Sequence, residues 1–251
     1  MLALDLDDTL LRSDLTISYR TRHVIRRAQE AGIVMVLTSG RIPASIGHFS
    51  RILGLHKHSG YIICNNGAMI QESHTGTIVN EVRLDVETAL SVYELAEAEG
   101  FPVQIYEYDI MYESRTKEDF RARAGGGCHK LLIPGDPMLL VPLESIIRTY
   151  LGENITLFTS KPYYLEILPV KTDKGTALEK VAGIMGIKPE EVLAIGDSMN
   201  DEAMIRWAGM GVAMVNGDER IKSIADLVTE KDNDNDGVAE VIEKYVLGKN
   251  G

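Results

Sequence analysis

The sequence predicts an α/β fold with a smaller α+β domain inserted into it. Apolar segments of strand length alternate with segments of helical periodicity at both ends of the chain. Each apolar segment ends in a group of small or polar residues, which is typical of parallel strands that lead into ligand-binding loops. Between about residues 83 and 168 the pattern changes to one helix followed by two strands, and then recurs. We therefore expect a Rossmann-like, doubly wound parallel sheet core at 1–82 and 169–251, with an inserted domain at 83–168.

The first core segment contains three strand-like runs and two helices. The first run is buried in character because Leu2, Ala3, Leu4 and Leu6 are apolar on both faces. Gly32 is placed to end the first helix, and Pro43 suits the first turn of the second. The expected elements are strands at 2–6, 33–37 and 61–64, and helices at 18–31 and from 43 onward.

The same patterns predict the elements of the inserted segment and of the last core segment. Glycines 125–127 lack the strand–loop–helix spacing of a phosphate-binding loop, so we expect a mobile loop there. In the insertion we expect helices at 86–99 and 143–151, a hairpin at 102–113, and strands at 130–133, 155–159 and 163–168. In the last segment we expect a helix at 172–185 and strands at 192–195 and 211–214.

The composition excludes several classes of partner. The chain of 251 residues has a net charge of −11, which argues against nucleic acid or an anionic membrane as partner. No apolar run reaches the ~18 residues that span a bilayer, and no secretory signal precedes Leu2, so a cytoplasmic location is expected. Cys64 and Cys128 are too few and too far apart for a disulfide framework or a zinc site.

Acidic residues follow two of the buried strands. Asp5 and Asp7 are two residues apart, so on a strand their side chains point to the same side. Asp197 and Asp201 follow the strand at 192–195, and parallel strands bring their carboxyl ends to one edge. Four carboxylates there would repel one another by about 4 kcal/mol per close pair at an effective dielectric near 20. A divalent cation is needed, and a set of oxygen ligands favours Mg²⁺.

Groups that bind anions are expected at the same edge. Lys174 lies at the start of a helix, where the helix dipole already favours anions. Ser39 and Gly40 precede another helix and offer a hydroxyl and backbone N–H groups. A cation site, a lysine, a hydroxyl and a helix N-terminus beside a carboxylate together indicate phosphoryl transfer.

An ordered set of motifs resembles the haloacid dehalogenase-like (HAD) superfamily, in its Cof-like branch with a type II cap. The resemblance covers the chain outside the insertion. The matching segments are Asp5–Leu10, Thr38–Arg41, Asn66–Ala68, Lys174–Leu178, Gly196–Asp201, Gly211–Met214 and Asp236–Ala239.

The resemblance implies a phosphatase mechanism. Asp5 matches the nucleophile that becomes an aspartyl-phosphate, and Asp7 matches the general acid and base. Mg²⁺ would be held by the Asp5 carboxylate, the Asp7 backbone carbonyl and Asp197, with Asp201 either a ligand or a support behind the ligands.

The remaining positions match the phosphate and substrate region. Ser39, Gly40, Lys174 and Asn200 correspond to phosphate-binding positions, and Arg41, Asn66 and Gly67 lie in the substrate region of the motif set. The family usually has glycine where this chain has Asp8, which adds a charge near the site. The short segment between Glu113 and Lys130 leaves little room for the extra cap elements of many relatives, so substrate identity does not carry over.

Three functions remain open at this point. The first is hydrolysis of a small phosphomonoester, either a sugar phosphate or a cofactor phosphate, as the phosphorylated partner. The second is a phosphomutase acting on a hexose phosphate, and the third is a catalytically silent binder of phosphorylated ligands. The oligomeric state cannot be read from the sequence.

Three further patterns have simpler interpretations. Asp232, Asp234 and Asp236 match the spacing of an EF-hand loop, but a strand-like segment precedes them, so a solvated loop is expected. His56-Lys57-His58 resembles a metal clip without further ligands, so we expect a surface turn. Arg121 and Arg123 could reach a substrate phosphate, although a solvated helix face is the simpler interpretation.

Overall fold

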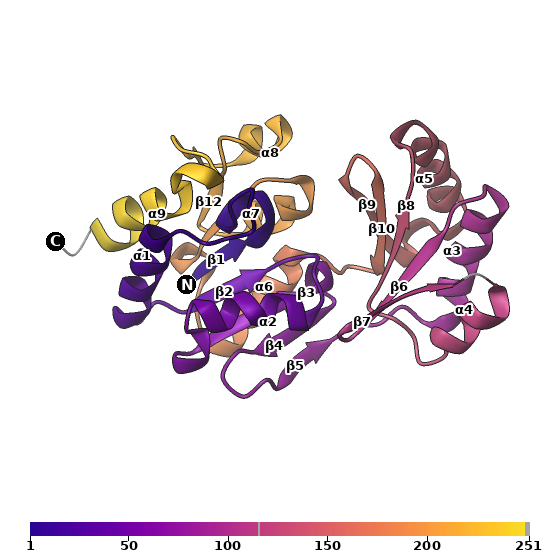
Figure 1. Cartoon of the computed structure of the whole chain (residues 1–251), viewed down its shortest axis with the longest axis horizontal. Coiled ribbons are helices and arrows are strands. Elements are labelled where there is room, and N and C mark those ends of the chain that lie inside the picture. Colours follow the sequence, from indigo (N-terminus) through magenta and orange to yellow (C-terminus); the bar gives the residue numbers. More distant parts are fainter. Residues whose placement is uncertain (115, 249–251) are drawn as a thin grey trace. The chain divides into compact units, whose positions relative to one another are not determined.

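The computed structural model describes residues 1–114 and 116–248 and consists of two compact units (Figure 1). The core unit is formed by Met1–Val79 and Lys174–Gly251, and the inserted unit by Asn80–Asp173. No helix in the described ranges combines the length and the apolar character that crossing a membrane requires.

The core unit is built on a sheet that has eight strands within the described residues, in the order β13-β12-β11-β1-β2-β3-β4-β5. All pairings from β13 to β3 are parallel. The strands are β1 (Leu2–Asp5), β2 (Met35–Thr38), β3 (Gly60–Cys64), β4 (Met69–Glu72), β5 (Ile78–Glu81), β11 (Leu193–Gly196), β12 (Met210–Ala213) and β13 (Leu227–Val228).

One edge of this sheet departs from the parallel pattern that the sequence predicts. β4 pairs with β3 in the antiparallel direction. The reversal is made by the tight turn Asn65–Gly67, in which Asn66 (φ 54°) and Gly67 (φ 108°) are left-handed. Asparagine and glycine tolerate this conformation better than other residues, and the chain therefore folds straight back onto β3.

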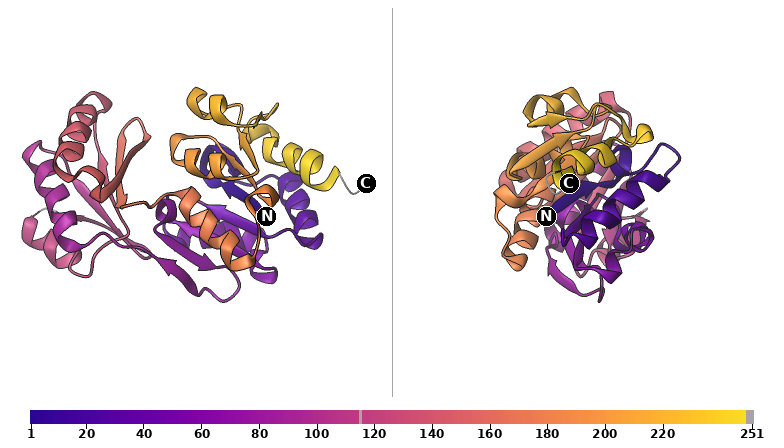
Figure 2. Two further views of the ribbon diagram at one scale, coloured as in Figure 1. Left: turned by 180° about the vertical axis from the view of Figure 1, so that it is seen from behind. Right: turned by 90° about the vertical axis from the view of Figure 1, so that its left-hand side faces the viewer.

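Helices cover both faces of the core sheet, which confirms the doubly wound α/β fold. Leu2 and Leu4 of β1 pack with α1 (Tyr19–Glu30), α2 (Pro43–Ile52) and α9 (Gly237–Val241), whereas Ala3 packs on the opposite face. That opposite face is covered by α6 (Lys174–Met185), α7 (Glu202–Trp207) and α8 (Glu219–Ile224). Figure 2 shows α6, in orange, on the side of the sheet that faces away in Figure 1.

The inserted unit is an antiparallel sheet with helices on one face, as the α+β prediction requires. Among the described residues the sheet has five strands, in the order β7-β6-β8-β10-β9. The strands are β6 (Val103–Glu107), β7 (Ile110–Ser114), β8 (Lys130–Pro134), β9 (Ile155–Lys161) and β10 (Tyr164–Pro169). Alternate residues of these strands form one core with α3 (Val86–Ala98), α4 (Lys117–Arg123) and α5 (Pro137–Leu151).

Helix α5 is longer than the sequence indicates. The sequence predicts it at 143–151. The structure starts the helix at Pro137, after the cap residue Asp136, whose side chain accepts a hydrogen bond from Met138 N. Pro142 lies close to this capped start, and the helix continues through it.

A buried histidine joins three segments of the inserted unit. His129 is fully buried, and its Nδ1 accepts from Tyr108 N at 3.2 Å. Its Nε2 therefore carries the proton and donates to Glu81 at 3.0 Å. Arg83 pairs with the same glutamate and with Glu107. Burial lowers the pKa of His129, helped by Arg83 and opposed by Glu81.

Stability of the inserted unit should therefore fall in mild acid. The pKa of His129 is lower in the folded chain than the usual value near 6.5, so the unfolded chain binds more protons as the pH falls below about 6.5. Thermal unfolding between pH 7.5 and 5 should show this loss, and His129→Gln should flatten the slope. His48→Gln, at an exposed position, is the control; an unchanged slope in His129→Gln would contradict the assignment.

Candidate active site

The expected site residues gather where the parallel strands of the core sheet end. β1 ends at Asp5, β2 leads into Ser39, and β11 leads into Asp197. Lys174 is the first residue of α6 and is fully buried. The sequence therefore correctly identified the edge of the sheet at which these groups meet.

Lys174 connects two carboxylates from distant parts of the chain. Its Nζ lies 2.6 Å from Asp5 Oδ1 and 2.6 Å from Asp201 Oδ1. All three side chains are buried, so each charge depends on its partners for solvation. The close packing of α6 against α7 permits this approach, because a Cβ on Gly175 would come 2.5 Å from the Ala203 carbonyl carbon.

Asp201 also organises the loop after β11. Its Oδ2 accepts from the backbone N–H groups of Asp197 at 3.0 Å and Ser198 at 3.1 Å. A Cβ at Gly196 would lie 2.5 Å from the Asp201 carboxyl carbon, so only glycine fits there. With Lys174 on Oδ1 and two amides on Oδ2, the Asp201 carboxylate holds Lys174 and the backbone of the loop after β11 in place.

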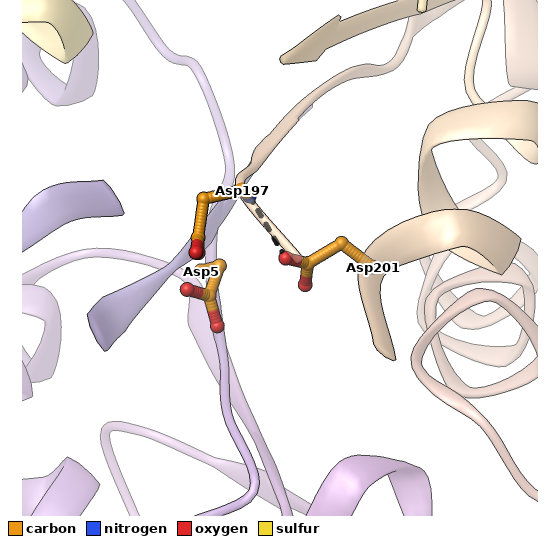
Figure 3. A group of neighbouring side chains, drawn as sticks. All are labelled: Asp5, Asp197 and Asp201. Carbon is orange, nitrogen blue, oxygen red and sulfur yellow. Dashed lines mark hydrogen bonds between the residues drawn. The ribbon is translucent and has the colours of Figure 1, made fainter. Parts of the chain in front are cut away.

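The carboxylates of Asp5, Asp197 and Asp201 form a buried acidic cluster (Figure 3). One oxygen from each lies within 4.8 Å of the others. Three carboxylates and the one ammonium of Lys174 leave two negative charges, and an all-oxygen donor set of this kind fits a divalent cation such as Mg²⁺. The acidic cluster therefore fits the cation that the sequence predicts.

The charges of the cluster shift the ionisation of its members. Burial raises the pKa of Asp5 well above its usual range, and the carboxylates of Asp201 and Asp197 add to this while Lys174 opposes it. Burial also opposes the charge on Lys174, but Asp201 and Asp5 outweigh it and raise the pKa of that ammonium group. Lys174 is therefore cationic, and the net excess of negative charge lies on the carboxylates.

Asp7 lies outside the acidic cluster, which corrects the expectation from strand alternation. β1 ends at Asp5, and the chain then turns, so Asp7 is not on the strand. Its carboxylate forms a two-bond ion pair with Arg41, in which Arg41 Nε lies 2.8 Å from Asp7 Oδ2. Arg41 is held in turn by Ser45 Oγ at 3.1 Å.

Asp8 explains why the motif family favours glycine at this position. Its φ is 61°, in the left-handed region that glycine adopts without strain and that Asp tolerates. The side chain is exposed, and the Asp8 carbonyl accepts from Asn216 Nδ2 at 2.7 Å. The extra charge therefore lies at the surface, outside the buried acidic cluster.

The other expected phosphate-binding residues form a connected set of loops. Ser39 N donates to Ile63 O at 3.0 Å, and its carbonyl accepts from Asn66 N at 3.0 Å. Asn200 Nδ2 donates to Asn66 Oδ1 at 3.1 Å. A Cβ on Gly40 would lie 2.9 Å from Asn66 Nδ2, so glycine lets the loop after β2 pack on the turn after β3.

Thr9 was not singled out from the sequence. Its Oγ1 donates to Asp197 Oδ1 at 3.0 Å and fixes the orientation of that carboxylate. Thr9 lies four residues beyond the strand end at Asp5, and this spacing gives no periodic indication of the contact. Only the parallel pairing of β1 with β11 brings the two residues together.

The residues that resemble an EF-hand loop have other partners. Asp234 accepts from Ser13 N and Oγ, Asp236 accepts from Thr21 Oγ1, and Asp232 accepts from Asn235 N. The possible metal-ligand group found in residues 1–114 and 116–248 includes none of these aspartates and no histidine. Asp234 and Asp236 therefore hold this loop to residues 13 and 21, and Asp232 caps the loop itself.

Arg121 and Arg123 have carboxylate partners in the inserted unit. Arg121 Nη2 lies 2.9 Å from Glu87, and Arg123 Nε lies 2.8 Å from Asp119. Both pairs are exposed, in agreement with the solvated helix face that was the simpler interpretation.

Comparison with known proteins places the chain in a family. A family model described as haloacid dehalogenase-like hydrolase matches residues 2–242, and the chain belongs to this family. A solved haloacid dehalogenase-like hydrolase from Bacteroides thetaiotaomicron is 35% identical, with a TM-score of 0.83, covering 97% of this chain and 98% of that one.

Two curated relatives are phosphatases by name. Phosphoglycolate phosphatase of Methanosarcina mazei is 30% identical, over 96% of this chain and 94% of its own length. The 5-amino-6-(5-phospho-D-ribitylamino)uracil phosphatase YcsE of Bacillus subtilis is 29% identical, over 98% and 96% respectively. The expected enzyme class, a phosphoric monoester hydrolase of the HAD superfamily, is confirmed.

Two substitutions that remove the same charge from the acidic cluster should have opposite effects on stability. Without divalent cations, Asp5→Asn should raise the free energy of unfolding by about 1–2 kcal/mol, because it relieves repulsion at a functional site. Asp201→Asn should lower it by about 3 kcal/mol, because it breaks a buried ion pair and a pair of amide contacts.

Urea unfolding in EDTA measures both changes. Circular dichroism of the parent and the two variants gives the midpoint and slope of each transition. A loss of stability in Asp5→Asn as large as that in Asp201→Asn would contradict the assignment of excess negative charge to the cluster.

Proposed function

We propose that the chain is a Mg²⁺-dependent phosphatase that hydrolyses small phosphomonoesters through an aspartyl-phosphate on Asp5. The observation that carries this proposal is the Asp5 carboxylate held by Lys174 at 2.6 Å within the acidic cluster. A carboxylate at the carboxyl edge of the sheet, beside a buried cation, is suited to attack phosphorus.

The two carboxylate oxygens of Asp5 have different surroundings. Lys174 binds Oδ1, so Oδ2 is the oxygen with room to form the bond to phosphorus. As that bond forms, the bond to the leaving alcohol breaks, and the alcohol oxygen requires a proton. Water then attacks the aspartyl-phosphate at phosphorus, which releases inorganic phosphate and restores Asp5.

Mg²⁺ would be held by the carboxylates of Asp5 and Asp197 and the backbone carbonyl of Asp7, with Asp201 as support, and would neutralise phosphate charge. Thr9 keeps Asp197 oriented for this task through its 3.0 Å hydrogen bond. Lys174, Ser39 and the N–H groups near Gly40 and Asn200 would bind the phosphate oxygens.

Asp7 would give the proton to the leaving alcohol and later accept one from water. Its ion pair with Arg41 fixes the carboxylate in one direction. The acid role requires that Asp7 leave Arg41 when the substrate binds.

The substrate proposal is limited to the class of small phosphorylated metabolites. The two named relatives act, by their names, on a phosphorylated two-carbon acid and on a phosphoribitylamino-uracil. Their shared feature is the phosphomonoester, and the residues of the acidic cluster would act on that group alone.

Release of inorganic phosphate should depend on the Asp5 carboxylate. We expect the purified chain with MgCl₂ to release phosphate from p-nitrophenyl phosphate and from members of a metabolite panel. Asp5→Asn should reduce the rate at least 10³-fold, because the nucleophile is lost. Asp8→Asn removes the same charge from an exposed neighbour, and asparagine tolerates the left-handed backbone of that position as aspartate does. This control variant should retain the rate within about threefold.

The same assay separates the alternatives. Isomerised hexose phosphate without phosphate release would favour a mutase. An equal rate in Asp5→Asn and the parent would overturn the nucleophile assignment.

Binding of Mg²⁺ should be visible without any substrate. Saturation to 100 times the dissociation constant stabilises the folded state by about 2.7 kcal/mol. MgCl₂ should therefore raise the thermal midpoint of the parent and, far less, that of Asp197→Asn. Asp14→Asn, at an exposed loop position, should respond like the parent. An equal response in Asp197→Asn would argue against a metal ligand at that position.

A further inference from the structure

The core unit contains a second polar site, a cavity of about 340 Å³ between α1 and the end of α2. It is bounded on its third side by the 3₁₀ turn Leu55–Lys57, which contains part of the His56-Lys57-His58 sequence. None of its lining residues belongs to the candidate active site. Helix α2 begins near the active site and spans about 15 Å along its ten residues, so Arg51, in its last turn, lies toward the other end of the helix.

The lining of this cavity is basic, although the chain as a whole carries a charge of −11. Arg22, Arg26, Arg51 and Lys57 all line it, and no aspartate or glutamate does. Within the described residues, Arg26 is the one of these four that has a carboxylate partner, Glu30, at 3.7 Å between exposed side chains. Four like charges around one small volume repel one another, and an anion would relieve that repulsion.

Two buried nitrogens of the lining also lack partners. Gln29 is 5% exposed, and its Nε2 has no hydrogen-bond partner in the described chain. The same holds for His56 Nδ1. A buried polar group without a partner costs about 1–3 kcal/mol, so such groups are normally satisfied by a ligand or water. Both residues line the basic cavity, which is where the missing partner would enter.

We propose that this basic cavity binds a polyphosphate, either inorganic or as part of a nucleotide. Its volume lies at the lower end of the range for small-molecule sites, about 300–1,000 Å³, and exceeds what a single phosphate fills. Guanidinium groups match phosphate oxygens in pairs, and four cations suit a ligand with several negative charges. The Gln29 amide adds a neutral donor that fixes the ligand in place.

Isothermal titration of the full chain in EDTA, which prevents metal-dependent turnover, tests the proposal. Tripolyphosphate and ATP are the two probes. We expect saturable 1:1 binding that weakens with added NaCl. Equal affinities for the two probes would mean that the cavity binds the phosphate chain alone. Tighter binding of ATP would mean that the cavity also binds the nucleoside.

Two sets of variants locate the site. Arg26→Gln/Arg51→Gln should weaken binding at least tenfold, which corresponds to about 1.4 kcal/mol. Arg27→Gln/Arg206→Gln removes the same charge from exposed positions of the core unit outside the cavity, and should stay within twofold of the parent. Gln29→Met leaves the charge unchanged and should weaken binding at least threefold.

Three outcomes would overturn the proposal. The first is no saturable binding of either probe at millimolar concentration. The second is equal loss in the cavity and control variants, which would mean that overall charge governs binding. The third is parental affinity in Gln29→Met, which would mean diffuse attraction to surface arginines. Unchanged thermal midpoints without ligand establish that the variants are folded.

Discussion

The ammonium group of Lys174, held between the buried carboxylates of Asp5 and Asp201, is the contact on which the rest of the core depends. It joins the first strand to the loop after β11, across 169 and 27 residues of sequence. Lys174 is also the first residue after the inserted unit, so the inserted chain returns to the core at this contact. Removing Lys174 would leave two buried carboxylates without their cation, and removing Asp201 would break the buried pair that also holds the loop after β11. Either loss is more costly than the loss of one exposed ion pair.

The sequence was sufficient to predict the sheet and the edge at which the acids meet. Buried strands such as Leu2–Asp5 have a continuous apolar pattern, and parallel strands bring their ends together whatever their loops do. The same reasoning failed for Asp7, because the residue at which a strand stops is not visible in its periodicity. The start of α5 was placed too late because it depends on the cap residue Asp136, which the sequence analysis did not identify.

What could not be predicted are contacts that exist only between packed loops. Gly196 is required because Asp201 lies where its Cβ would be, and Gly40 because Asn66 does. Thr9, in the turn after β1, orients Asp197. The partner lies 26 positions away for Gly40 and 188 for Thr9, but only five for Gly196. In none of these cases does a single sequence reveal that the two residues meet. The acidic EF-hand pattern shows the converse, since its spacing is right while its carboxylates accept hydrogen bonds from Ser13, Thr21 and the loop's own Asn235.

The two polar sites of the core unit lie toward opposite ends of α2, and the helix dipole helps to explain why. Residues that would bind phosphate oxygens through backbone N–H groups precede the N-terminus, where the partial charge is positive. Arg51 occupies the last turn, where the partial charge is negative and a cation is stabilised without a carboxylate partner. The arginines and Lys57 can therefore remain close together around the basic cavity in an acidic protein. Within the part of the chain that the structure describes, Arg51 and Lys57 have no carboxylate partner, so their charged donors can serve an anion, whereas the donors around Asp201 are already used within the fold.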